Sequence, residues 1–179
     1  MTITINGSGT ITGINAGGLP DAIITQAELA TNVAGTGPAF SATPSTTQTV
    51  TTATYTKVNL GTENFDTNSN FASSRFTPTI AGYYQLNASV YLAVTGGTAL
   101  YIWSIIYKNG VAAIYGNLNT PVGGGAGVDG VGISSGLLYM NGTTDYVESY
   151  IYASASAGTI NVGGAGTFTV FSGVLVKGA

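Results

Sequence analysis

Carboxylates and lysines are the only candidate general acids and bases in this 179-residue chain, because it contains neither histidine nor cysteine. Asp145 and Glu148 are close in sequence, but on a predicted strand their odd spacing places them on opposite faces, so they cannot form the carboxylate pair of a glycosidase. Loops carry most of the other acids, and solvation explains them. We therefore predict no catalytic residue and no enzyme. The carboxylates are Asp21, Glu28, Glu63, Asp66, Asp129, Asp145 and Glu148.

Asp129, in the segment GVDGVG, is the one candidate metal ligand. With backbone carbonyl oxygens, its carboxylate could bind Ca²⁺ on a loop. The alternative, which we prefer, is a turn residue that stabilises its own loop. Thiolate metal sites are excluded because cysteine is absent. We predict no cofactor.

Tyrosines are the feature with most functional potential, since a ring with a polar edge suits subunit interfaces and sugar-stacking sites. The alternative is that most of them fill the core or pack between subunits. Trp103, inside YIWSIIY, is predicted to be buried in the core or between subunits. The tyrosines are Tyr83, Tyr91, Tyr101, Tyr107, Tyr115, Tyr139, Tyr146, Tyr150 and Tyr152.

The charge content excludes several classes of partner. The net charge is −3, and the four basic residues Lys57, Arg75, Lys108 and Lys177 are scattered singly, so neither nucleic acid nor an anionic membrane surface is expected to bind. The uncharged run from Phe76 to Tyr107 is broken by Gly96-Gly97 and by polar residues, so we predict no membrane insertion. A charged fraction of 6% with 27 glycines is typical of lasting extracellular assemblies. The first residues do not resemble a signal peptide.

The chain divides into two predicted parts. In residues 1–38, TITINGSGTITG predicts a β-hairpin with a two-residue Asn-Gly turn, and Thr25 with Glu28 predicts a capped short helix. This arm has too few large apolar residues for its own core and is expected to dock on a partner. Residues 39–179 form the second part.

From Phe40 onward, period-two alternation and turn signals predict about eight to ten strands in a sandwich or barrel. In FTPTIAGYYQLNASVYL, Tyr84, Leu86, Ala88 and Val90 share one face, which indicates a half-buried strand. YKNGVAAIYG is the clearest hairpin, and PVGGGAGVDGVG and SAGTINVGGAG are expected to be end loops. The predicted strands are Ala39 to Ala42, Tyr55 to Asn59, Ser73 to Thr77, Gly82 to Val94, Ala99 to Lys108, Val111 to Gly116, Val128 to Met140, Thr144 to Tyr152, Ala157 to Val162 and Thr167 to Val176.

The order of landmarks in the second part resembles the globular head of the complement-one-q and tumour-necrosis-factor superfamily. These landmarks are Leu60, Asp66, Phe71, Phe76, Gly82, Tyr84, Leu86 and the C-terminal FSGVLV from Phe171 to Val176. Leu60 and Leu86 replace preferred Phe residues, Ala88 replaces Phe or Tyr, and the Phe71 to Phe76 interval is shorter than usual. The resemblance implies an all-β, antiparallel jelly-roll sandwich of about ten strands that forms a homotrimer. It implies core or trimer-packing roles for Phe71, Phe76, Tyr84, Leu86, Trp103 and Phe171.

The first part is similar to N-terminal segments of phage tail-fibre and virion-surface proteins, through GTITGINAGGLPDAIITQAELA. Together the two resemblances imply a phage virion structural protein: a trimeric capsid-decoration knob or stubby fibre on the virion surface, docked on capsid or tail proteins. Host-receptor or glycan binding, by a fibre or by a secreted lectin-like module, is the alternative, and a glycan hydrolase is a third. The predicted docking residues are Ile3, Ile5, Ile11, Ile14, Leu19, Ile23 and Leu29.

Overall fold

The computed structural model describes residues 4–5, 11–12, 35–97, 99–120, 129–164 and 168–179. The chain divides into two units, Met1–Ala30 and Thr31–Ala179. Within the described residues, no helix has the length and apolar character to cross a membrane.

In the first unit, β1 (Thr4–Ile5) pairs antiparallel with β2 (Ile11–Thr12). The predicted hairpin is therefore present, but its predicted two-residue turn is wrong, because Ile5 lies opposite Ile11 and residues 6–10 connect the strands. The helix predicted at Thr25 lies outside the described residues.

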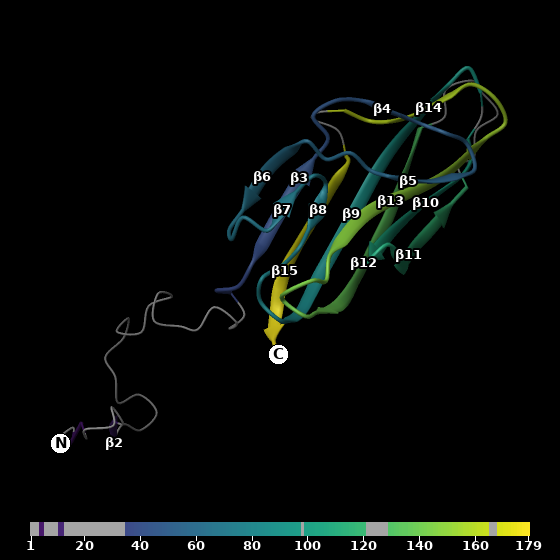
Figure 1. Cartoon of the computed structure of the whole chain (residues 1–179). Coiled ribbons are helices and arrows are strands. Elements are labelled where there is room, and N and C mark those ends of the chain that lie inside the picture. Colours follow the sequence, from purple (N-terminus) through teal and green to yellow (C-terminus); the bar gives the residue numbers. More distant parts are fainter. Residues whose placement is uncertain (1–3, 6–10, 13–34, 98, 121–128, 165–167) are drawn as a thin grey trace. The chain divides into compact units, whose positions relative to one another are not determined.

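Among its described residues, the second unit, the head, contains thirteen strands. They form two antiparallel sheets of a sandwich, which confirms the predicted jelly-roll class (Figure 1). The strands are β3 (Ala39–Thr43), β4 (Gln48–Val50), β5 (Thr54–Lys57), β6 (Thr62–Asp66), β7 (Phe71–Ala72), β8 (Arg75–Phe76), β9 (Gly82–Thr95), β10 (Ala99–Lys108), β11 (Val111–Asn119), β12 (Asp129–Met140), β13 (Val147–Ala155), β14 (Thr159–Val162) and β15 (Val170–Gly178).

The seven-stranded sheet is organised around the long strand β9. On one side β9 pairs with β12 along its length, from Gly82 to Ala93. On the other side, β15 and β14 pair with successive parts of β9. Farther from β9, β4 pairs with β14, and β3 pairs with β15. β6 then pairs with β3. The sheet therefore has β12 at one edge, and β4 and β6 form the opposite edge.

The six-stranded sheet has β10 and β13 at its centre. β10 pairs with β11 on one side and with β13 on the other. The far side of β13 pairs with β5 and β8, and β8 pairs with β7. Asn109 and Gly110 connect β10 to β11 with positive φ angles of 53° and 79°, which confirms the predicted Asn-Gly hairpin.

Several strand boundaries differ from the predicted ones for identifiable reasons. Instead of one strand from Ser73 to Thr77, β7 and β8 form a small hairpin whose turn residues Ser73 and Ser74 have positive φ. β13 starts only at Val147, because the side-chain oxygen of Asn141 accepts three backbone N–H bonds and fixes a turn through Asp145. Part of the predicted loop PVGGGAGVDGVG belongs to β12, which begins at Asp129; residues 121–128 lie outside the described residues.

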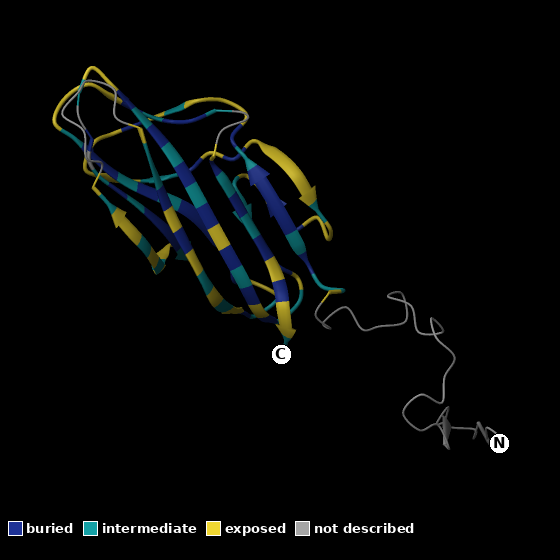
Figure 2. Ribbon diagram, turned by 180° about the vertical axis from the view of Figure 1, so that it is seen from behind, coloured by how far each residue is buried: buried dark blue, intermediate teal, exposed yellow. Residues whose placement is uncertain are grey.

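The core lies between the sheets and follows the predicted alternation (Figure 2). Tyr84, Leu86, Ala88 and Val90 of β9 are all at most 1% exposed. The Tyr84 hydroxyl donates to the Ile80 carbonyl at 2.8 Å, and burial raises the pKa of Tyr84 to about 12. Phe40 packs against three other core rings, those of Phe71, Phe76 and Phe171.

Candidate functional site

The predicted docking residues fall almost entirely in the first unit's undescribed segments. Ile5 and Ile11 lie opposite each other in the β1–β2 hairpin. The other five, Ile3, Ile14, Leu19, Ile23 and Leu29, lie outside the described residues.

Five of the six residues predicted for core or trimer packing lie in the core of the head: Phe71, Phe76, Tyr84, Leu86 and Phe171. Trp103 differs, because it is half-buried on the outer face of the six-stranded sheet and does not enter the core. Its ring packs on Tyr115 with centroids 4.9 Å apart, and its indole N–H donates to the Gly116 carbonyl at 2.9 Å. In YIWSIIY, large apolar side chains occur on both faces of the strand, so the sequence could not show which face enters the core.

Asp145 is a buried structural acid rather than a solvated one. Its carboxylate lies 2.8 Å from the Lys108 ammonium and accepts bonds from the Asn109 side chain and the Asn141 backbone. The hydrogen bond from Lys108 lowers the pKa of Asp145, assisted by those from Asn109 and Asn141. Asp145 precedes β13, so the prediction that it shares a strand with Glu148 is wrong; the two acids nevertheless occupy separate clusters.

Glu148, on β13, is also buried, since it is only 3% exposed. Its Oε1 atom accepts a hydrogen bond from the Lys57 ammonium at 2.7 Å and another from Nε of Arg75 at 2.9 Å. We call these three residues the Glu148 cluster. Burial alone would raise the pKa of Glu148, but the two cations outweigh it and the pKa is lowered. Half of the chain's four basic residues are therefore gathered at one buried carboxylate.

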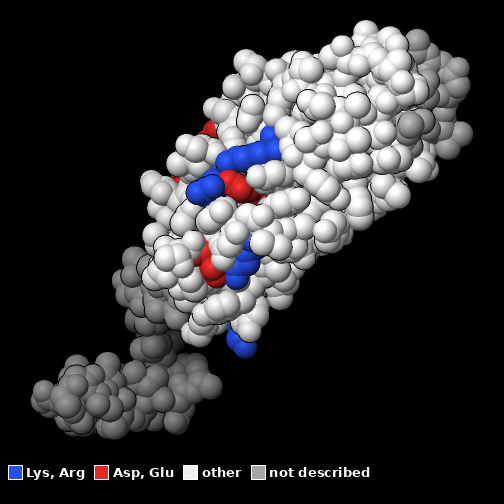
Figure 3. All heavy atoms as spheres, turned by 45° about the vertical axis from the view of Figure 1, so that its right-hand side comes forward, with Lys and Arg blue, Asp and Glu red and all other residues white. Residues whose placement is uncertain are grey.

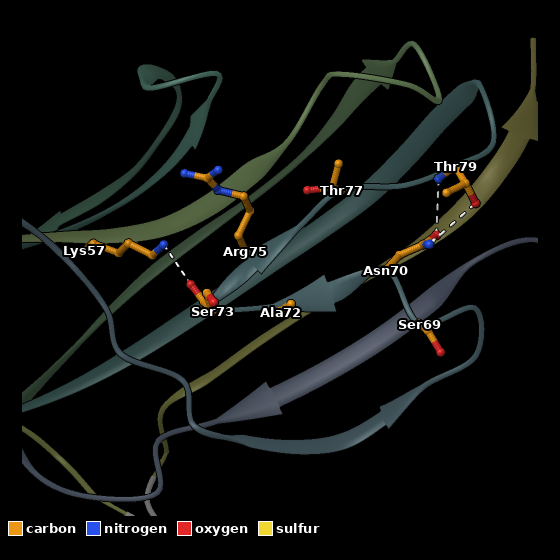
Figure 4. Close-up of a pocket in the computed structure, with 8 residues that line it drawn as sticks. All are labelled: Lys57, Ser69, Asn70, Ala72, Ser73, Arg75, Thr77 and Thr79. Carbon is orange, nitrogen blue, oxygen red and sulfur yellow. Dashed lines mark hydrogen bonds between the residues drawn. The ribbon is translucent and has the colours of Figure 1, made fainter.

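An open cavity of about 480 Å³, lined mainly by residues with polar side chains, lies beside the Glu148 cluster, and its volume is within the size range of small-molecule sites. Figure 4 shows Lys57 and Arg75 at one end, and Asn70 and Thr79 at the other. The remaining lining residues are Ser69, Ala72, Ser73 and Thr77. Sequence spacing could not have revealed this site, because the site combines Lys57 of β5 with residues in and around the β7–β8 hairpin.

Among the described residues, Asp129 is not part of an acidic group that could hold a metal ion. Its carboxylate accepts a hydrogen bond of 2.6 Å from the Tyr91 hydroxyl, and this bond raises the pKa of Tyr91, with smaller contributions from burial and from the charge of Asp129. Among the described residues, no three acidic side chains come together in a group that could hold a metal ion.

The outer face of the six-stranded sheet carries rows of aromatic rings. In one row, Trp103 of β10 lies opposite Tyr152 of β13, which lies opposite Tyr55 of β5. In a neighbouring row of the same sheet, Tyr150 of β13 lies opposite Ile105 of β10 on one side and Lys57 of β5 on the other. Tyr107 stacks on Tyr150 with centroids 3.9 Å apart, and Tyr101 stacks on Tyr152 at 5.9 Å. Ile105 is 0% exposed yet lies outside the core cluster, so these partly exposed rings form an apolar layer that covers Ile105.

The outer face of the seven-stranded sheet has a different character. It exposes large apolar side chains around a polar ladder in which Ser135 hydrogen-bonds with both Gln85 and Asn87. Among the described residues of β3, β9, β12 and β15, charge is found only on Asp129 and Lys177. We call this surface the apolar face. Its exposed apolar residues include Tyr83, Ile133, Leu137, Tyr139, Val174 and Val176.

A second exposed apolar surface lies on β11, the last strand of the six-stranded sheet. Val111, Tyr115 and Leu118 are 69%, 55% and 56% exposed. β11 lies against β12, where the side chain of Asn117 accepts a hydrogen bond from the Ile133 backbone and that of Asn119 donates to the Val131 carbonyl. The apolar edge formed by β11 therefore borders the apolar face.

Comparison with known proteins identifies the fold. No protein-family model and no curated protein matches the chain. Two crystal structures of murine APRIL, determined at pH 5.0 and pH 8.0, have TM-scores of 0.56 and 0.55 at 12% identity. Each comparison covers 77% of this chain and 98% of the APRIL chain. The head therefore has a jelly-roll fold of the tumour-necrosis-factor and complement-one-q type.

Proposed function

We propose that this chain is a phage virion surface protein, a homotrimeric knob or short fibre held on capsid or tail proteins by its N-terminal arm. The observation that carries the proposal is the apolar face. Monomeric proteins rarely expose a broad, nearly uncharged apolar surface, and subunit interfaces are depleted in charge and enriched in aromatic residues. Ile133, Leu137 and Val174 are 53%, 53% and 39% exposed. Burying what remains of each would contribute about half of the roughly 1.5–3 kcal/mol that a fully exposed side chain gives, or somewhat less.

A second copy of the chain is the occupant that fits this surface best. The superfamily whose fold the head shares assembles as trimers, as the sequence resemblance implied. The apolar face and the apolar edge are different surfaces, and contacts between different surfaces generate rings when the rotation closes. In a cyclic trimer, the edge of each head would pack on the face of the next, and both surfaces would be covered.

The virion role follows from the two-part organisation. The head contains its own core, whereas Met1–Ala30, within the arm, is a separate unit whose sequence resembles phage virion segments. Three arms on one trimer would strengthen docking through avidity. We place the assembled protein on the virion surface.

The experiment that tests this proposal uses the full-length chain and a deletion that lacks residues 1–30. Light scattering should give a trimer for both proteins, and only the full-length protein should decorate phage particles. A monomeric full-length protein would refute the trimer, and a deletion that still decorates particles would refute docking by the arm.

The aromatic outer face favours a second role, host-receptor or glycan binding. Tyrosine and tryptophan rings offer apolar faces on which sugar rings pack, while their polar atoms remain available for hydrogen bonds. Binding of the full-length protein to a glycan array would support this role.

A further inference from the structure

We propose that the cavity beside the Glu148 cluster binds an acidic saccharide, with the sugar carboxylate held by Arg75 and Lys57. This inference gives a site and a ligand class to the glycan-binding role, and it requires only the folded head. The cavity has a net positive charge and hydroxyl-bearing lining residues, and two tyrosines lie beside its cations; each of these features suits a different part of such a ligand.

The cavity is positively charged because the Glu148 cluster contains two cations and one carboxylate. Lys57 and Arg75 contribute two positive charges, and Glu148 contributes one negative charge. Both cations bond to the same carboxylate oxygen, Oε1. The cluster therefore retains one net positive charge, on a head whose other cations are Lys108 and Lys177.

Arg75 has donors left for a ligand. Among the described residues its guanidinium bonds through Nε, which leaves the two terminal amino groups, and its side chain is 42% exposed. Lys57 uses its ammonium for Glu148 and the Ser73 carbonyl, and one further donor remains. Arginine presents paired donors that match a carboxylate, so the geometry favours a planar carboxylate ligand.

The rest of the cavity suits sugar hydroxyls. Its lining includes four residues that carry hydroxyls, Ser69, Ser73, Thr77 and Thr79, and also Asn70, whose amide already bonds to Asn68 and Thr79. Bonds between Asn70 and Thr79, drawn in Figure 4, hold that end in place. Neutral donors and acceptors complement hydroxyl groups, whereas a cavity for a multiply charged anion would require more cations.

Two tyrosines lie next to the cations of the cavity and offer apolar rings to a sugar that extends beyond its lining. The guanidinium carbon of Arg75 lies 3.8 Å from the centre of the Tyr146 ring, and Tyr150 lies directly opposite Lys57 in the sheet. Both tyrosines are partly exposed. Stacking on Tyr146 also fixes Arg75, which reduces the entropy that Arg75 would lose on binding a ligand.

Calorimetric titration of the full-length protein tests the proposal. The acidic probes are 3′-sialyllactose and trigalacturonate, and the neutral probes are lactose and chitotriose. We expect the acidic probes to bind at least tenfold more tightly than the neutral ones, and increasing salt to weaken the binding. Arg75→Gln should weaken it at least tenfold. The matched control is Lys177→Gln, which removes the same charge from the other sheet and should have little effect.

Thr77→Val provides a second variant, because it removes a lining hydroxyl and leaves the Glu148 cluster intact. It should weaken saccharide binding severalfold without affecting inorganic sulfate. The proposal is wrong if neutral and acidic probes bind equally, if no probe binds at millimolar concentration, or if sulfate competes fully while Thr77→Val has no effect. Light scattering on the same samples reports trimer formation separately, so failure of this site and failure of the assembly can be distinguished.

Discussion

At Glu148, burial and two neighbouring cations act on the pKa of the carboxyl group in opposite directions. Removing a carboxylate from water favours its protonated form, while two cations within 3 Å favour the ionised form. The pKa of Glu148 is lowered, so the cations outweigh burial. The same net direction holds for Asp145, which Lys108 stabilises as an anion. Both acids therefore contribute stability in their ionised forms.

The first prediction concerns pH. A lowered folded-state pKa gives stability that is complete above the unfolded-state pKa and is lost as pH falls through the folded value. The melting temperature should therefore be nearly constant from pH 8 to about pH 5 and should fall below the ordinary values of 3.8 for Asp145 and 4.5 for Glu148. Glu148→Gln should be less stable at pH 7 by roughly 1.5–3 kcal/mol and should show a smaller fall in acid.

The control for the pH series is Glu63→Gln, which neutralises an exposed acid of β6. Thermal melts at each pH are the measurement. A Glu148→Gln variant as stable as the wild type at pH 7 would contradict the assignment of Glu148 as a stabilising anion.

The second prediction concerns two buried serines. The hydroxyl of Ser149 has no hydrogen-bond partner among the described residues, whereas those of Ser104 and Ser134 bond to each other at 2.9 Å. Ser149→Ala should stabilise the head by about 1 kcal/mol, because it removes an unsatisfied polar group. Ser104→Ala should destabilise it by about 1–3 kcal/mol, since it leaves the Ser134 hydroxyl buried without its partner. Urea denaturation measures both, and equal effects of the two substitutions would contradict this account.

At the element scale, three glycines allow the two sheets to meet along one edge. A Cβ atom at Gly116 of β11 would collide with the Ile133 carbonyl of β12, and one at Gly136 would meet the Ile114 side chain. A Cβ atom at Gly132 would lie 3.0 Å from the Ser104 backbone nitrogen. With Asn117 and Asn119 bonding to the β12 backbone, this contact shields an edge strand that would otherwise offer unpaired groups.

The third prediction follows from this contact. Gly116→Ala should separate β11 from β12 and destabilise the head by roughly 1–3 kcal/mol, as overpacking does. Amide exchange at Ile133 should accelerate, because its hydrogen bond to Asn117 would be strained. Ala113→Ser, at an exposed position of β11, is the control. Unchanged exchange at Ile133 in Gly116→Ala would show that β11 does not hold β12.

At the scale of the whole molecule, the two outer faces of the head are chemically different. The face visible in Figure 3 carries acidic and basic side chains in small mixed groups within a large uncharged surface. On the six-stranded sheet, aromatic rings pack largely on one another and on Ile105, around the Glu148 cluster. The apolar face leaves Ile133 and Leu137 each 53% exposed. In the proposed trimer, the apolar face and the β11 edge form the interface, and the part of the six-stranded sheet around the Glu148 cluster stays accessible to ligands.

The fourth prediction tests this assignment. Leu137→Glu should convert the proposed trimer to a folded monomer, because a buried charge without a partner is incompatible with an apolar interface. Tyr55→Glu changes a residue of similar exposure on the six-stranded sheet and should remain trimeric. Light scattering with circular dichroism measures both. A trimeric Leu137→Glu variant would place the interface elsewhere.

The sequence by itself determined the sandwich class, the face of β9 that enters the core and the hairpin at Asn109-Gly110. These features depend on local patterns, since alternation fixes which side chains share a face and Asn-Gly permits positive φ. Strand boundaries were less predictable at the β7–β8 hairpin and at the Asn141 turn, because hydrogen bonds within those turns competed with strand pairing.

Only the tertiary structure decided which charged groups meet and which aromatic rings leave the core. Glu148 is separated from Lys57 by 91 positions and from Arg75 by 73, and the pairing of β13 with β5 and β8 brings them together. Alternation places the neighbours Ile102 and Trp103 on opposite faces of β10, but only the packing of the sandwich shows that Ile102 enters the core and that Trp103 lies on the outer face. A single sequence specifies local periodicity, but these contacts depend on the register between distant strands, which is set by the packing of the whole sandwich.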